Sequence, residues 1–162
     1  MRPHEIFASM QTDHTVDFFR RLADDSPIIF DQAVHAAALA MKSRPQYLMK
    51  QPFEKKAAAA RRCLARVIAA PLAGEILATY FLESRVELLV EWLDLLGLEH
   101  EKGVLAADAP ESPSEAELAR HLEAFRGKDP EPDRELLLRA FAAQPSIDWP
   151  AMEALLEGPP SD

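Results

Sequence analysis

Cysteine is almost absent from this sequence. Cys63 is the single cysteine in 162 residues, which excludes a disulfide bond within one chain and favours a reducing compartment. It follows an alanine-rich run and has no second thiol near it in the sequence. We therefore expect Cys63 to act as a small, buried or half-buried apolar residue; the alternative is a thiolate favoured by Lys56 or Arg66.

Motifs for catalysis and metal binding are also missing. The five glycines are scattered singly, which excludes a glycine-rich phosphate loop, and the chain has no HExxH motif, cysteine cluster or GxSxG nucleophile elbow. We therefore predict no catalytic residue, no metal site and no cofactor. Asp31 with His35 and Glu117 with His121 are spaced four apart, which is typical of helix-stabilising pairs; catalysis or metal binding is the less common alternative.

Long uncharged apolar runs are absent as well. The first residues, MRPHEIFASMQTDHTV, contain no apolar core of signal-peptide length. The run closest to a membrane span, Pro71–Leu98, is interrupted by five acids and Arg85. We therefore expect a cytoplasmic protein with no membrane partner.

Residues that favour strands are scarce. Leucine, alanine, glutamate and arginine are abundant, whereas glycine and β-branched residues are few, so helix propensity is high almost everywhere. Apolar residues make up 48% and charged residues 28% of the chain, which is ordinary for a globular protein. The sequence predicts an all-α fold with essentially no sheet.

The stretch Pro71–Leu98 is the predicted central element. Gly97 supplies a left-handed residue of the kind that ends helices, and a turn near residues 83–85 that would split the stretch is left open. A helix this apolar must be enclosed by others, so we predict a multi-helix bundle around it. Read as a helix, the stretch carries one acidic stripe on an otherwise apolar surface: Glu83, Glu87, Glu91 and Asp94.

Prolines at predicted helix starts define the remaining helices. A charged, proline-containing stretch at residues 99–113 predicts a linker. It separates an N-terminal bundle, residues 1–98, from a small three-helix unit, residues 114–158, which we expect to pack on the first. The predicted helices outside the central stretch cover residues 3–10, 12–23, 27–43, 46–50, 52–70, 114–127, 132–141 and 149–156.

Charge is the most uneven property of the sequence. The whole chain carries −9, yet the basic segment, residues 42–66, holds eight lysines and arginines against the single acid Glu54. One interpretation is pairing within the molecule, with the acidic stripe or the acidic region after Glu99 as partner. The other is a docking surface for an anionic partner, above all an acidic protein segment and otherwise a phosphate-bearing ligand. The candidate docking residues are Lys55, Lys56, Arg61, Arg62 and Arg66.

The function that follows is a non-enzymatic protein–protein interaction or adaptor module, because large apolar helices without a catalytic constellation suit such a role. A small enzyme or ligand-binding protein is the alternative, and it requires Asp31, His35 and Tyr80 or Arg85 to converge in one cleft. A weak nucleic-acid binder is the third possibility, which the net charge of −9 disfavours.

Two further features concern association. Trp149 and Met152, near the end of the chain, have the chemistry of interface anchors, but such residues more often pin a terminal helix to its core. A homo-oligomer formed through uncovered helix faces stays open.

Overall fold

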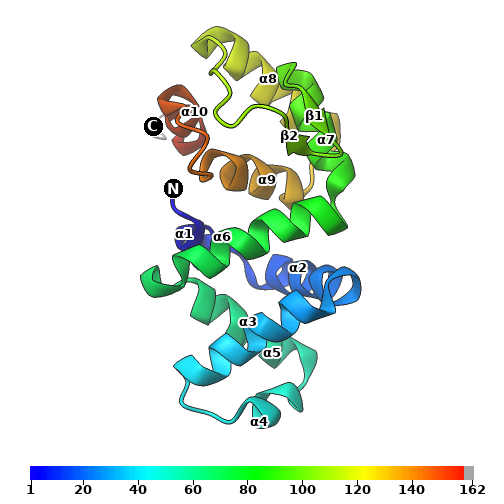
Figure 1. Cartoon of the computed structure of the whole chain (residues 1–162), viewed down its shortest axis with the longest axis vertical. Helices are drawn as coiled ribbons and strands as arrows, with labels where there is room; N and C mark the ends of the chain where they lie inside the picture. Colours follow the sequence, from blue (N-terminus) through cyan, green and yellow to red (C-terminus); the bar gives the residue numbers. More distant parts are fainter. Residues whose placement is uncertain (159–162) are drawn as a thin grey trace. The chain divides into compact units, whose positions relative to one another are not determined.

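The computed structural model describes residues 1–158, except the side chain of Lys128, and within this range it is almost entirely helical (Figure 1). This confirms the predicted all-α class. The helices are α1 (Pro3–Ser9), α2 (Thr12–Asp25), α3 (Pro27–Ala40), α4 (Pro45–Met49), α5 (Phe53–Leu64), α6 (Ala70–Thr79), α7 (Val86–Leu96), α8 (Glu115–Lys128), α9 (Pro132–Ala142) and α10 (Pro150–Glu157). The shorter elements are the 3₁₀ turn η1 (Val67–Ala69), the π-helical turn η2 (Tyr80–Ser84) and the strands β1 (His100–Glu101) and β2 (Val104–Leu105).

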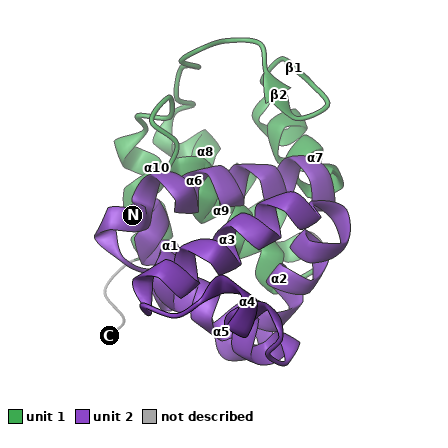
Figure 2. Cartoon of the chain, turned by 60° about the horizontal axis from the view of Figure 1, so that its bottom comes forward, with its two compact units in different colours: residues 1, 85–162 green, residues 2–84 purple. Residues whose placement is uncertain are grey.

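The chain forms two compact units that meet in the sequence between Ser84 and Arg85 (Figure 2). The N-terminal unit, Arg2–Ser84, contains α1 to α6, and the C-terminal unit begins at Arg85 and contains α7 to α10. The division therefore falls before α7, not at the linker predicted after residue 98. The reason is packing: Trp92 of α7 contacts Phe125 of α8 and Phe141 of α9, with ring centroids 5.4 and 5.9 Å apart.

The predicted central helix is interrupted at Arg85. Its backbone dihedrals, φ −135° and ψ 42°, lie outside the helical region. The π-helical turn η2 precedes it, and Arg85 itself is the N-cap of α7. The turn that the sequence left open near residues 83–85 is thus a real break, and it separates the two units. Gly97 ends α7 with φ 71°, as predicted.

The predicted linker contains a small hairpin. Strands β1 and β2 pair antiparallel, with His100 opposite Leu105. Lys102 and Gly103 form the turn with φ of 51° and 89°, the combination that a two-residue hairpin turn of type I′ requires. His100 accepts a hydrogen bond from the Gly103 amide at Nδ1, so Nε2 carries the proton and donates to Asp94 at 2.8 Å.

The core of the N-terminal unit joins an aromatic cluster to a close contact between two alanine-rich helices. Phe18 of α2 and Tyr80 lie with ring centroids 4.1 Å apart. Helix α5 packs against α3, where Ala37 of α3 and Ala60 of α5 are fully buried. Small side chains let two helix axes approach closely. This contact fixes which side of α5 faces outward.

Helix α5 ends at Leu64, six residues before the predicted end. Arg66 is extended, with φ −86° and ψ 142°, and η1 follows it. Val67 and Ile68, which lie inside the predicted helix 52–70, are 61% and 80% exposed. The predicted end was wrong because the chain leaves the helical conformation at Arg66.

One helical run among the described residues, Val67–Ser84, is long and apolar enough to cross a membrane by length and composition alone. Its mean hydropathy is 1.3, and 33% of it is buried. The predicted stretch Pro71–Leu98 did not qualify as a membrane span, because it contains three acids and Arg85 that lie outside Val67–Ser84. Core helices of globular proteins meet the same two criteria, and Ile76 and Leu77 of this run are buried. The run therefore carries no membrane assignment.

Candidate partner-binding surface

The outward side of α5 carries the cations that the sequence singled out. Because Ala57, Ala60 and Leu64 are buried, the opposite side of the helix points away from the core. Lys55 and Arg62, seven residues apart and hence nearly two turns along the same side, are exposed there. Arg66, just beyond the helix end, is exposed as well.

The five predicted docking residues divide into two groups. Lys56 is half-buried, and its Nζ lies 5.8 and 5.9 Å from the ring centroids of Phe30 and Phe53. Arg61 is half-buried and donates a hydrogen bond to the backbone oxygen of Phe7 at 3.3 Å. These two cations are tied to their own unit. The other three, Lys55, Arg62 and Arg66, are the ones available to a partner.

Three more exposed cations precede α5, so the basic segment has six: Lys42, Arg44, Lys50, Lys55, Arg62 and Arg66. In the described part of the chain, none of the six forms an ion pair with a carboxylate. Glu54 is the only acid within the segment, and its Oε1 lies 3.7 Å from Nη2 of Arg20 in α2. The positive charge of the segment is therefore not neutralised by its own unit.

The acidic stripe has other partners. Within the C-terminal unit, Glu91 pairs with Arg134 at 2.6 Å, and Asp94 accepts the hydrogen bond from His100. Glu87 pairs with Arg85 at 2.7 Å. Three of the four stripe acids therefore have partners within the C-terminal unit. Neutralisation of the basic segment by the stripe, one of the two interpretations of the sequence, gains no support from them.

Large apolar side chains close to the cations in the chain are exposed, which was not predicted from the sequence. Leu39, Met41 and Tyr47 are 73%, 51% and 63% exposed. Within the predicted helix 46–50, only Leu48 is buried. Helix α4 is five residues long, little more than one turn, so it can turn only one side inward. The alternation of basic and large apolar residues in LAMKSRPQYLMK is the sequence signal for this surface.

A shallow groove lies between α3 and α4. Its volume is about 430 Å³, and its lining residues are His35, Pro45, Gln46, Met49 and Lys50. Methionine and the exposed tyrosine next to it are residue types over-represented in protein interfaces. The groove thus joins an apolar floor to one of the six exposed cations.

Lys42 has an unusual backbone. Its φ is 53°, in the left-handed region that ordinarily holds glycine after a helix. Around it the chain closes α3 as a Schellman motif does: the amide of Ser43 donates to the oxygen of Ala38 at 2.9 Å. A lysine here is strained by roughly 1–2 kcal/mol relative to right-handed backbone.

The residues of the enzyme alternative do not meet in the N-terminal unit. Asp31 and His35 are exposed on α3, and His35 Nδ1 donates to the backbone oxygen of Asp31 rather than to its carboxylate. Tyr80 is 1% exposed and lies against Phe18 in the core. A shared cleft of the kind that the alternative requires is therefore absent from this unit, residues 2–84.

Arg85, the fourth candidate, is held by carboxylates of the C-terminal unit. Its Nη1 lies 2.6 Å from Asp133, its Nη2 2.6 Å from Glu131, and its Nε 2.7 Å from Glu87. Burial alone would lower the pKa of Arg85, but these hydrogen bonds and negative charges raise that pKa above its ordinary value. The guanidinium is permanently charged, and each of its three nitrogens donates a hydrogen bond to a carboxylate.

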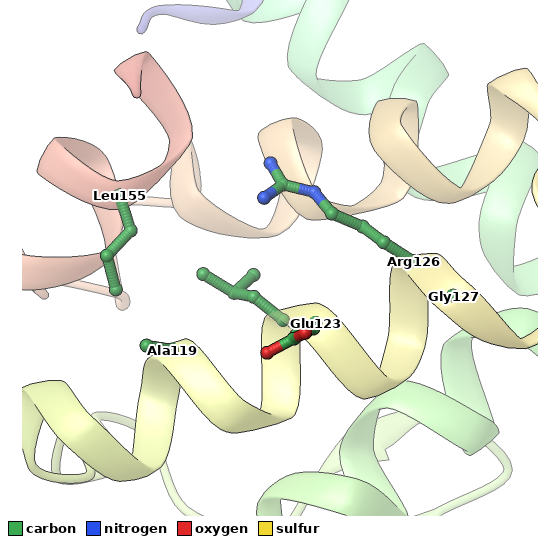
Figure 3. Close-up of a pocket in the computed structure, with 6 residues that line it drawn as sticks. Ala119, Glu123, Arg126, Gly127 and Leu155 are labelled. Carbon is green, nitrogen blue, oxygen red and sulfur yellow. The ribbon is translucent and has the colours of Figure 1, made fainter. Parts of the chain in front are cut away.

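A second shallow groove, of about 330 Å³, lies between α8 and α10 (Figure 3). The side chain of Leu155 of α10 points toward Ala119 of α8. Both guanidinium bonds of Arg126 go to Glu135, at 2.8 Å each. Of the two charged residues that line the groove, Glu123 and Arg126, the arginine is thus already paired within its own unit.

The remaining candidates are buried. Trp149 and Met152 are 3% and 0% exposed, and Trp149 donates to the backbone oxygen of Pro110 at 3.0 Å, so both pin α10 rather than face a partner. Burial raises the pKa of the Cys63 thiol, although Arg66 opposes the shift. No cluster of three or more histidine, cysteine or acidic residues suited to a metal ion occurs among residues 1–158.

The fold and the surface together define a class: an all-α protein that carries an exposed, cationic and partly apolar surface on its N-terminal unit. Comparison with protein families, with curated proteins and with solved structures finds no match to this chain.

Proposed function

We propose that this protein is a non-enzymatic binding module whose basic segment holds an acidic segment of a protein partner. The observation that supports this most directly is the set of six exposed cations that form no ion pair among the described residues. Unpaired charges of one sign attract a partner of the opposite sign and raise its rate of association.

The surroundings of the cations favour a protein partner. Interfaces combine arginine with exposed tyrosine and methionine, and Arg44 lies near Met41 and Tyr47 in the chain. Purely electrostatic binding of phosphate would need no such apolar residues. Lys55 and Arg62 lie on α5, and Arg44 and Lys50 are the N-cap and C-cap of α4, so the fold holds the backbone of these cations in place for a partner.

A direct binding measurement tests this proposal. The probe is a fluorescein-labelled peptide of alternating glutamate and leucine, titrated with the whole protein at low and physiological salt. We expect binding that weakens as salt rises, and a loss of at least tenfold in affinity for the triple variant Lys55→Glu, Arg62→Glu, Arg66→Glu.

The matched control reverses three exposed cations outside the segment: Arg21→Glu, Lys102→Glu and Arg120→Glu. It changes the net charge of the chain by the same amount. The control should bind the peptide nearly as the unaltered protein does. Equal losses in both triple variants, or no binding by the unaltered protein at low salt, would contradict the proposal.

Nucleic acid is the second candidate, and one observation favours it. Tyr47 is 63% exposed between Arg44 and Lys50, and an aromatic ring among cations can stack on a base. Labelled single-stranded RNA in the same titration separates the two functions. Tighter binding of RNA than of the peptide would support the nucleic-acid function. No binding of RNA at low salt would exclude that function.

A further inference from the structure

The charges of this chain are divided between its two units. The N-terminal unit, residues 2–84, has eleven lysines and arginines against nine aspartates and glutamates, whereas residues 85–162 have seven against eighteen. One chain therefore carries a surface that needs an acidic partner and an acidic region of its own.

One exposed acidic region of the C-terminal unit is the acidic segment, residues 99–117. It contains one cation, Lys102. Between residues 106 and 114 it has no regular secondary structure. None of its acids forms an ion pair within the described part of the chain. All six of its acids are exposed: Glu99, Glu101, Asp108, Glu111, Glu115 and Glu117.

We propose that the occupant of the basic segment is the acidic segment of a second copy of this chain. This inference rests on the proposed function, because it names the partner of the same surface. Six exposed cations on one segment face no ion partner in their own unit, and six exposed acids on the other are equally unpaired. Each segment offers the chemistry that the other needs.

The dimensions suit this pairing. Nine residues of extended chain, 106–114, span up to about 30 Å at 3.3–3.6 Å per residue. Helix α5, with its twelve residues, is about 18 Å long at 1.5 Å per residue. The acidic segment can therefore run the length of α5 and reach the cations at both ends.

Apolar contacts complement the charges. Val104 in the hairpin of the acidic segment is 59% exposed. Met41, directly before the basic segment, and Tyr47 within it are 51% and 63% exposed. An interface that buries these side chains would gain stability from the hydrophobic effect in addition to the ion pairs.

The net charge of −9 on each copy does not prevent the contact. Exposed charges are screened beyond about 8 Å at physiological ionic strength, so opposed segments in contact dominate over the distant net charge. Because the two surfaces differ, the contact is heterologous. It closes into a dimer if two copies exchange segments, and otherwise it continues into a chain of copies.

Sedimentation velocity of the whole protein over a range of concentrations tests the inference. We expect self-association that weakens at least tenfold between low and high salt. Two variants should each abolish it: the basic-reversed protein, Lys55→Glu, Arg62→Glu, Arg66→Glu, and the acid-reversed protein, Glu99→Lys, Asp108→Lys, Glu111→Lys. Circular dichroism melts check that both variants fold.

Mixing gives the decisive result. In an equimolar mixture, the acidic segment of the basic-reversed protein can bind the basic segment of the acid-reversed protein, because both are unaltered. The two altered segments also carry opposite charges. Association should therefore return. A labelled peptide of residues 99–117 should bind the unaltered protein and not the basic-reversed one. A monomer at every concentration and salt, no recovery on mixing, or binding only to phosphatidylserine vesicles would overturn the inference.

The outcome for the proposed function is separate. If the protein stays monomeric and ignores the 99–117 peptide, but still binds the glutamate–leucine peptide through Lys55, Arg62 and Arg66, only the identity of the partner is wrong. If the basic-reversed variant binds every acidic probe normally, the proposed function fails as well.

Discussion

Nη1 of Arg85 lies 2.6 Å from Oδ2 of Asp133, and both side chains are buried. The pair connects the first residue of the C-terminal unit to the start of α9, 48 positions later in the chain. Glu131 binds the same guanidinium at 2.6 Å. The N-cap of α7 and the first turn of α9 are thus held by one charged group, and loss of that group would leave a buried carboxylate without its counter-ion.

We expect Arg85→Met to lower the free energy of unfolding of the C-terminal unit by about 3–5 kcal/mol, the cost of breaking a buried ion pair from one side. Urea denaturation measures it, with fluorescence of Trp92 and Trp149 as the signal because both lie in this unit. The matched control is Arg126→Ala, whose partner Glu135 is 38% exposed, and its cost should stay below about 1 kcal/mol.

A double variant sharpens that prediction. If the pair acts as a unit, Arg85→Met combined with Asp133→Asn should cost less than the sum of the two single changes, because each single change already removes the interaction between the two side chains. Simple additivity of the two losses would show that the buried pair is not what holds α9.

Helix starts could be predicted from the sequence because their causes are local. Pro3, Pro27, Pro45 and Pro132 each stand in the first turn of a helix, where a missing amide proton costs nothing. Ser114, the N-cap of α8, accepts a hydrogen bond from the amide of Glu117. These features depend on residues three or four apart.

The break at Arg85, and the fact that α7 belongs to the C-terminal unit, depend on residues that are distant in the sequence. The carboxylates that hold Arg85 lie 46 and 48 positions away, and no local pattern indicates them. From the sequence alone, the apolar side of α7 could pack either on the helices that precede it or on the helices that follow it. Composition suggested a boundary near residue 98, whereas packing of Trp92 on Phe125 assigns the helix to the later set.

The candidate surface could be predicted only in part. The excess of cations over residues 42–66 can be counted in the sequence. Which of them stay free cannot, because Lys55 and Lys56 are neighbours and only tertiary packing places one over the rings of Phe30 and Phe53. Tyr47 was missed because its exposure follows from the shortness of α4.

The two neighbouring lysines therefore give a clean comparison. Lys56→Gln should lower the free energy of unfolding by about 0.5–1 kcal/mol, since it removes a cation from above two aromatic rings. Lys55→Gln, on the exposed side of the same helix turn, should change it by less than about 0.5 kcal/mol but weaken binding of the acidic peptide. Thermal or urea unfolding measures the effect on stability, and peptide titration measures the effect on binding. Identical behaviour of both variants would argue against the division of the docking residues into half-buried and available cations.

Lys42→Gly should stabilise the N-terminal unit although it removes a side chain. Glycine relieves the left-handed strain of roughly 1–2 kcal/mol, and the greater freedom of glycine in the unfolded chain offsets about half of that. The expected net gain is about 0.5–1 kcal/mol, read from urea denaturation. Lys42→Ala keeps the Cβ atom and is the control, which should gain nothing. If the surface binds as proposed, both variants lose affinity for the acidic peptide, so stability and binding change independently.

Cys63 should react slowly in the folded protein. Its side chain is 9% exposed, and burial raises the pKa of the thiol above its ordinary value of 9.0, so little thiolate is present at neutral pH. We expect a disulfide reagent at pH 8 to label the native protein at least tenfold more slowly than the urea-unfolded protein. Arg66 opposes the upward shift, so Arg66→Ala should slow native labelling further, whereas Arg21→Ala should not.

The same raised pKa gives the sign of a pH effect. The folded protein holds the thiol proton more tightly than the unfolded chain does, so the contribution of Cys63 to stability is complete below the unfolded pKa of 9.0 and is lost as the pH rises above it. Cys63→Ala removes this contribution and should therefore unfold with a weaker dependence on pH in the range above the unfolded pKa of 9.0. An unchanged slope in that range, measured by urea denaturation, would mean that the thiol titrates alike in both states and that its slow labelling comes from restricted access alone.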